Sequence, residues 1–133
     1  MTQYEEERQH CKEIADTLEA YANGDMWRDE EGEEVNLNDL TEEEREAVME
    51  QGEELSLYDC FDEVFDIEYR VGSDGAYRSV QLMVACGGPN IYIDTASGRV
   101  ELYWWGDKAD YPIDRDTIEA IDQLWEEYYE MTK

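Results

Sequence analysis

The residues best suited to act as a nucleophile and a base are neighbours in the chain, at Cys11 and His10, and His10 is the sole histidine. Both lie in a segment with helical spacing. Adjacent residues of a helix point about 100° apart, so these two side chains do not form a catalytic dyad. We expect Cys11 to lie in the core and His10 to be exposed. Without a nucleophile and base pair, we expect the protein not to be an enzyme.

Cysteine usage indicates a reducing compartment. Cys11, Cys60 and Cys86 are an odd number of cysteines, and they are widely spaced, without a C-x-x-C pair. No secretory apolar segment follows Met1, and no stretch approaches the roughly 18–20 apolar residues of a membrane span. We therefore expect a cytoplasmic protein that has no disulfide and no contact with membranes.

Acidic residues in a loop raise the question of a metal site. The run Asp25–Gly32 places Trp27 where an EF-hand needs an oxygen ligand, so the calcium pattern fails. Thirty-seven acids among 133 residues make close carboxylate pairs unavoidable, and no apolar pocket marks out one pair. The Gly87-Gly88-Pro89 turn lies between strands and lacks the lysine of a phosphate loop. We expect no metal, no cofactor and no catalytic residue.

The formal charge of −27 is the strongest feature of the composition. Its sign excludes direct binding to nucleic acid or to anionic membranes, because phosphate recognition needs lysine and arginine. Duplex DNA has one charge per about 1.7 Å of axis, so 27 charges correspond to about 46 Å of duplex. A folded chain of this length is very roughly 35 Å across, which gives a comparable charge density. We therefore expect a positively charged, nucleic-acid-binding protein as the partner.

Most of this charge lies in the first half of the chain, where residues 1–62 have a net charge of −18. Side chains three or four residues apart on a helix lie about 5–6 Å apart at Cβ, similar to the spacing of phosphates along a strand. Carboxylates at this spacing can replace phosphates in a basic groove. The candidate partner-binding carboxylates are Glu30, Glu31, Glu33, Glu34, Glu42, Glu43, Glu46, Glu50 and Glu53.

Helical periodicity predicts the elements that position these acids. An amphipathic helix runs from Tyr4 to Asn23 and ends near Gly24. The polar stretch Asp25–Asp39 is predicted to be a loop. Thr41–Glu44 matches a capping box, which predicts a second helix that runs to about Gln51.

After a short helical turn predicted at Ser56–Asp59, the period changes from 3.6 residues to 2. Four alternating segments separated by tight turns predict a four-stranded antiparallel meander. A helix capped by Asp114 or Asp116 follows and packs on the sheet. The prediction is one α+β domain over residues 1–133, with two N-terminal helices, the meander and a C-terminal helix. The apolar residues that alternate in these segments are Phe65, Ile67, Tyr69, Val71, Val80, Leu82, Val84, Cys86, Ile91, Ile93, Val100, Leu102 and Trp104, and of these Val80, Leu82, Val84, Val100, Leu102 and Trp104 are expected to face the core.

On the other face of the meander, alternation brings together Met83, Tyr92, Tyr103 and Trp105. An exposed aromatic cluster is a candidate partner-binding surface, with Tyr103 and Trp105 as its anchors. The alternative is that a helix or the predicted loop covers this face and makes it a second core layer. The alternation pattern does not decide between the two.

In length, charge and acidic helices beside a small sheet, the chain resembles the nucleic-acid-mimic inhibitors of phages and mobile elements, the anti-CRISPR and anti-restriction proteins. The stretch from Asp62 to Tyr129 contains Gly87-Gly88-Pro89-Asn90, Ile93-Asp94-Thr95 and Tyr103-Trp104-Trp105-Gly106. With these segments, it also resembles a family of small uncharacterised proteins on mobile elements of Firmicutes. The first resemblance implies stoichiometric inhibition of a host defence complex, with a CRISPR effector favoured over a restriction enzyme. An acidic interaction module, such as an immunity protein for a basic toxin, is the alternative.

Overall fold

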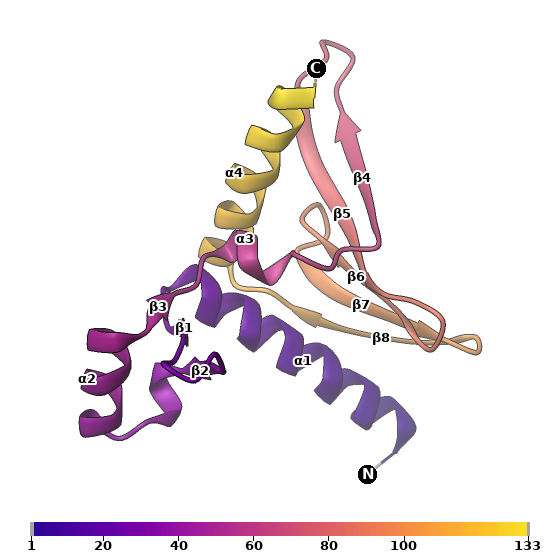
Figure 1. Ribbon diagram of the computed structural model, residues 1–133. Coiled ribbons are helices and arrows are strands. Elements are labelled where there is room, and N and C mark those ends of the chain that lie inside the picture. Colours follow the sequence, from indigo (N-terminus) through magenta and orange to yellow (C-terminus); the bar gives the residue numbers. More distant parts are fainter. Residues whose placement is uncertain (1, 133) are drawn as a thin grey trace.

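The computed structural model describes residues 2–132 and has the α+β fold that the sequence predicts. A long helix comes first, antiparallel sheets follow, and a long helix comes last (Figure 1). None of the helices within residues 2–132 is long and apolar enough to cross a membrane. The elements are α1 (Gln3–Ala22), β1 (Met26–Arg28), β2 (Glu34–Asn36), the 3-10 helix η1 (Leu37–Asp39), α2 (Glu42–Gln51), β3 (Glu53–Glu54), α3 (Leu57–Cys60), β4 (Asp66–Val71), β5 (Tyr77–Ala85), β6 (Asn90–Asp94), β7 (Arg99–Trp104), β8 (Asp107–Pro112) and α4 (Arg115–Thr132).

The main sheet is an antiparallel meander of five strands in the order β4-β5-β6-β7-β8. The prediction of four strands is wrong, because it misses the fifth strand, β8. β8 begins after a two-residue turn at Trp105 and Gly106, whose φ angles of 50° and 85° are both positive. Such a turn has the twist that joins two strands tightly. β8 was missed because Ala109 and Tyr111 are its only apolar residues before Pro112, which gives a weak alternation.

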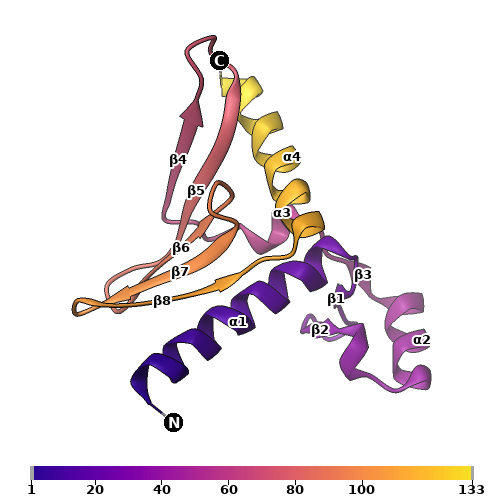
Figure 2. The same ribbon diagram turned by 180° about the vertical axis from the view of Figure 1, so that it is seen from behind.

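Helices cover one face of the main sheet. α1 packs across β7 and β8, α4 packs along β5, and within residues 2–132 no helix lies on the other face (Figures 1 and 2). As predicted, alternate strand residues build the core against α1, α3 and α4. The strand residues that are at most 2% exposed are Val80, Leu82, Ile91, Ile93, Val100, Leu102 and Ala109.

The edge strand β4 departs from its predicted pattern. Phe65, Ile67 and Val71 are exposed, although they alternate with polar residues as the buried residues of the central strands do. The physical reason is that α4 packs along β5, which leaves the edge of the sheet with little cover. Tyr69 is the exception, because its ring lies 5.3 Å from the ring of Tyr129 in α4.

Side-chain caps fix the starts of both long helices. Thr2 accepts the backbone N–H of Glu5 at 3.1 Å at the start of α1. Asp114 accepts the backbone N–H of Thr117 at 3.2 Å at the start of α4. Of the two predicted caps of α4, Asp114 is therefore the one used, and Asp116 lies in the first turn, where its charge favours the helix dipole.

The segment between α1 and α2 differs from its prediction. Asp25–Asp39 is not a plain loop, since it contains β1, β2 and η1, and β3 completes a second antiparallel sheet in the order β2-β1-β3. These strands are two or three residues long, which is too short for a period to be recognised. Asp29 closes the hairpin, because its carboxylate accepts the backbone N–H groups of Glu31 and Glu33 at 3.0 and 2.9 Å.

The helical elements that follow are as predicted. Thr41 and Glu44 form the capping box at the start of α2, with side chain to backbone distances of 3.2 and 3.1 Å. α2 ends at Gln51, as the sequence indicates. Ser56 precedes the single turn of α3.

A half-buried ion pair joins three strands on the helix-free face of the main sheet. Arg70 of β4 reaches across β5 and donates to both carboxylate oxygens of Asp94 at 2.7 Å. The Asp94 side chain is 7% exposed, and the Arg70 side chain is 38% exposed. Asp94 also accepts the backbone N–H groups of Ala96 and Ser97. The bonds from Arg70, followed by those from the two amides, hold the pKa of Asp94 below its ordinary value.

Candidate functional site, an acidic arm

Residues 25–54 form an arm that projects from the end of α1 away from the main sheet (Figures 1 and 2). The arm consists of the small sheet, η1 and α2. We call it the acidic arm because it contains fourteen aspartates and glutamates against two arginines. Its net charge of −12 is close to half of the total of −27, in under a quarter of the chain.

Buried apolar residues and hydrogen bonds lie where the acidic arm meets the body. Tyr21, Leu37 and Leu55 are buried, and all three lie outside the main core. The backbone N–H of Asp25 donates to the carbonyl of Ala20 in α1 at 2.9 Å, and the hydroxyl of Tyr21 donates to Glu34 at 3.1 Å. The arm is therefore attached without burial of its outer acids.

α2 forms the outer edge of the acidic arm, and none of its residues is buried. Glu42, Glu46 and Glu50 follow one another at intervals of four and so share one face of the helix. Its 10 residues span about 15 Å, a length that corresponds to about four phosphates of one nucleic-acid strand. With Glu43 and Glu44, the helix has five carboxylates over this length. The charge of α2 per unit length thus approximates that of a single strand.

All nine predicted partner-binding carboxylates lie in the acidic arm and are exposed. The predicted helical row is wrong at its end, because α2 stops before Gly52 and Glu53 belongs to β3. The structure thus divides the predicted set in two. Glu30, Glu31, Glu33, Glu34 and Glu53 lie in the hairpin and the small sheet, and Glu42, Glu43, Glu46 and Glu50 lie in α2.

Several of the arm carboxylates already have partners within the protein. Arg28 lies between Glu34 and Glu53, with N–O distances of 3.9 and 4.0 Å. The hydroxyl of Tyr21 donates to Glu34 at 3.1 Å, and burial, followed by this bond, raises the pKa of Tyr21. The pKa of Glu44 is lowered because its carboxylate accepts a backbone N–H in the capping box. These carboxylates stabilise the arm itself.

Four carboxylates of α2 differ from these. Within residues 2–132, Glu42, Glu43, Glu46 and Glu50 have no hydrogen bond or ion pair from their side chains. Arg45, the only base in the α2 sequence, donates through Nε to the carbonyl of Leu37 at 3.2 Å. A basic partner can therefore bind the four glutamates without breaking an internal contact. We call them the α2 glutamates.

The residues considered for nucleophilic chemistry are placed as expected. Cys11 is fully buried and His10 is exposed. Burial, followed by repulsion from Asp110, raises the pKa of the Cys11 thiol to about 11. Burial likewise raises the pKa of Cys60 to about 12. Both thiols are therefore protonated at neutral pH, the form that is the poorer nucleophile.

The predicted aromatic anchors lie at the far end of the molecule from the acidic arm, near the β7–β8 turn (Figures 1 and 2). Tyr103 is exposed on the helix-free face, and its ring lies 5.9 Å from that of Tyr92. Trp105 does not join them. It occupies the turn, is 86% exposed and packs on Trp104, whose ring belongs to the core face. The alternative of a second core layer is wrong, because within residues 2–132 neither a helix nor the segment Asp25–Asp39 covers this face (Figures 1 and 2).

The conformation of Trp105 leads to a prediction on stability. Its φ of 50° lies in the left-handed region, which a bulky residue rarely adopts and which asparagine adopts at lower cost. We expect Trp105→Asn to raise the free energy of unfolding by about 0.5–1 kcal/mol, measured by urea denaturation. A loss of stability would show that the Trp104 contact outweighs the backbone strain.

Within the described residues, no three histidine, cysteine, aspartate or glutamate side chains come together as ligands for a metal ion. Comparison with known proteins adds no relative, since no family model, no curated protein and no solved structure matches this chain.

Proposed function

We propose that the protein is a stoichiometric inhibitor of a nucleic-acid-binding host defence complex, and that its acidic arm takes the place of nucleic acid in that complex. The observation that supports this most is the set of α2 glutamates, which have no partner within residues 2–132 and lie at about the charge density of a nucleic-acid strand. A CRISPR effector is the first candidate target and a restriction enzyme is the second. Both have basic channels sized for nucleic acid.

The proposed mechanism requires no catalytic group. The exposed carboxylates of the acidic arm attract the basic channel and speed the encounter between the two proteins. In the complex, α2 lies along lysine and arginine side chains that otherwise hold phosphates. Because the arm projects from the main sheet, it can enter a channel while the sheet stays outside (Figure 1). Inhibitor and nucleic acid then exclude each other.

Affinity capture with matched variants tests this proposal. The arm variant E42Q/E43Q/E46Q/E50Q removes four exposed charges from α2, and the control variant E13Q/E19Q/E63Q/E126Q removes four from exposed positions elsewhere. We expect the wild-type protein and the control variant to capture a CRISPR or restriction subunit from a nuclease-treated bacterial lysate. The arm variant should not capture it. Equal capture by all three proteins would contradict the proposal. Capture of a single small basic toxin would support the alternative function, that of an immunity protein for a basic toxin.

We also expect the affinity of this complex to depend steeply on salt. Exposed charges are screened beyond about 8 Å at physiological ionic strength and beyond about 3 Å at 1 M. Between about 0.1 and 0.5 M NaCl, the dissociation constant should rise at least tenfold, because the α2 glutamates act from exposed positions. Isothermal titration calorimetry at four salt concentrations measures this dependence. A dissociation constant that does not change would remove the electrostatic basis of the proposal.

A further inference from the structure

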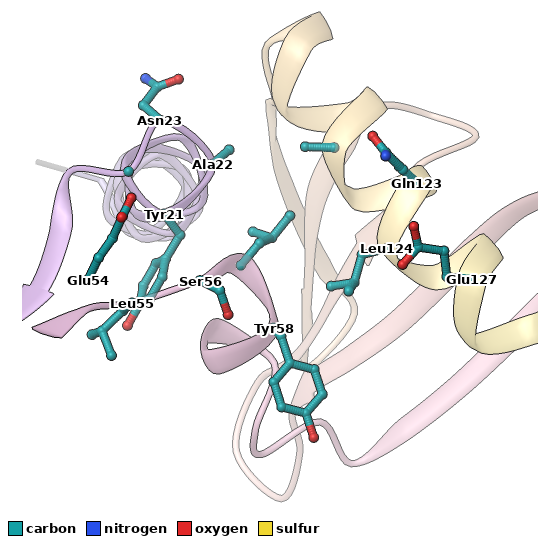
Figure 3. Close-up of a pocket in the computed structure, with 13 residues that line it drawn as sticks. Tyr21, Ala22, Asn23, Glu54, Leu55, Ser56, Tyr58, Gln123, Leu124 and Glu127 are labelled. Carbon is teal, nitrogen blue, oxygen red and sulfur yellow. The ribbon is translucent and has the colours of Figure 1, made fainter. Parts of the chain in front are cut away.

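An open cleft lies at the base of the acidic arm, between the end of α1, the segment that leads into α3, and α4 (Figure 3). Its volume is about 630 Å³, which is within the range of sites that accept small ligands. Leu55, Leu57, Ala120 and Leu124 give it apolar walls, and Figure 3 shows Leu124 projecting from α4 toward the segment that carries Ser56. The cleft can therefore take the aliphatic part of a side chain.

The rim of this cleft is negative on both sides. Glu54 of the acidic arm and Glu127 of α4 line opposite walls (Figure 3). The Glu54 carboxylate lies against the end of α1, because a Cβ built on Gly24 would be 2.7 Å from its Oε1. The last turn of this 20-residue helix has no basic residue, so the negative end of its dipole adds to the two carboxylates. These three negative features attract a positively charged group to the rim.

The charge of the whole molecule narrows the choice of occupant. A second copy of this chain would bring another −27, and a nucleic acid would bring phosphates, so both would be repelled. Tyr58 adds an aromatic ring that is 51% exposed. Arginine suits such a place better than lysine, because its planar guanidinium is more weakly hydrated and stacks on aromatic rings. The aliphatic stem of arginine matches the apolar walls.

We propose that this cleft binds an arginine side chain of the basic partner, with the stem against Leu57 and Leu124, the guanidinium at the carboxylate of Glu127, and Glu54 adding negative charge on the opposite wall. The inference rests on the proposed function only in that it takes a basic protein as the partner. It adds a desolvated anchor to a surface whose other contacts are exposed charges. Anchors of this kind account for most of the affinity of many interfaces.

Titration with short peptides tests the cleft without knowledge of the partner. The probe is the blocked tripeptide Gly-Arg-Gly, and the control is Gly-citrulline-Gly, which has nearly the same shape and no charge. In amide NMR spectra, we expect saturable shifts at Ala22, Asn23 and Leu124 with the arginine peptide alone. Two variants probe the walls and the rim. Ala120→Leu fills the cleft without a change of charge, and E54Q/E127Q removes the negative charge of the rim. Each variant should weaken peptide binding at least fivefold, while its melting temperature stays within a few degrees of that of the wild-type protein.

The outcomes separate this inference from the proposed function. The arm variant E42Q/E43Q/E46Q/E50Q should bind the arginine peptide as the wild-type protein does, although it should no longer capture the defence complex. Shifts spread over all exposed carboxylates, or an Ala120→Leu variant that binds the peptide unchanged, would overturn the cleft and leave the acidic arm intact. An arm variant that still captures the complex, while Ala120→Leu does not, would overturn the acidic arm and support the cleft.

Discussion

Replacement of the α2 glutamates by lysine is expected to lower the affinity for the target at least about 100-fold, which corresponds to about 2.7 kcal/mol. In the proposed complex, each of the four carboxylates faces a lysine or an arginine, so each substitution turns an attraction into a repulsion. No internal contact is lost, because these side chains have no partner within residues 2–132. The measurement is the displacement of a labelled duplex from the captured complex, with fluorescence anisotropy as the readout.

The stability of this variant determines how the result is interpreted. Glu42 and Glu43 lie in the first turn of α2, where lysine is expected to cost about 0.3–1 kcal/mol each through the helix dipole. Relief of repulsion in a chain of charge −27 acts in the opposite direction. We therefore expect a melting temperature within a few degrees of the parent. The matched control is E13K/E19K/E63K/E126K, which should displace the duplex almost as well as the parent. An equal loss of affinity in both variants would show that the total charge of the protein, and not the position of the α2 glutamates, determines binding.

The second large effect is expected in the main sheet. Arg70→Met should lower the free energy of unfolding by about 2–3 kcal/mol, because it leaves the carboxylate of Asp94 buried without its counterion. This value is below the usual range for broken buried pairs, since the Arg70 side chain is 38% exposed. Arg99→Met is the matched control. Its ion pair with Asp110, at 3.0 Å, is about one-third exposed on both sides and should contribute less than about 1 kcal/mol.

The same ion pair predicts a dependence on pH. The folded-state pKa of Asp94 lies below its unfolded value, so its contribution is fully present above the unfolded pKa of about 3.9 and is lost as the pH falls through the folded pKa. Urea unfolding of the wild-type protein from pH 7 to pH 2 should show this loss below about pH 4. Arg70→Met should flatten the Asp94 part of the profile. Parallel curves for the two proteins would show that Arg70 does not set the pKa of Asp94.

The parts of the fold that the sequence predicts well are those with a repeated physical signal. α1 and α4 have apolar stripes of several turns, and the capping box at Thr41 marks the first residue of α2. Strict alternation in β5, β6 and β7 identifies the buried strand residues, which reach 0% exposure at Val80 and Val100. These signals are local, so they can be recognised before the fold is known.

The elements that escaped prediction depend on contacts that the local sequence does not show. β1 and β2 pair over three residues and are held by the Asp29 turn, a signal that acids on both sides of Gly32 obscure. β8 follows a tight turn with tryptophan at a position where asparagine or glycine is usual. A turn signal at Trp105-Gly106 would have identified the fifth strand.

The sequence identifies which acidic residues belong to the candidate site, but it does not predict how they are arranged in space. Charge counts along the chain identify the acidic residues of the arm, because exposure of glutamate is the rule. The projection of the arm and the separation of Tyr103 from it are tertiary properties (Figures 1 and 2). The cleft beside Glu127 joins segments more than 60 residues apart, and no spacing rule reaches that far.

Competition between the protein and nucleic acid for one isolated defence complex tests the acidic arm most directly. A labelled duplex is titrated onto the complex at several fixed concentrations of the protein, and its binding is followed by anisotropy. If the acidic arm occupies the nucleic-acid channel, the apparent dissociation constant of the duplex will rise in proportion to the concentration of the protein, and one molecule per channel will suffice. If a ternary complex forms, in which the protein is bound and the duplex keeps its affinity, then the acidic arm does not replace nucleic acid.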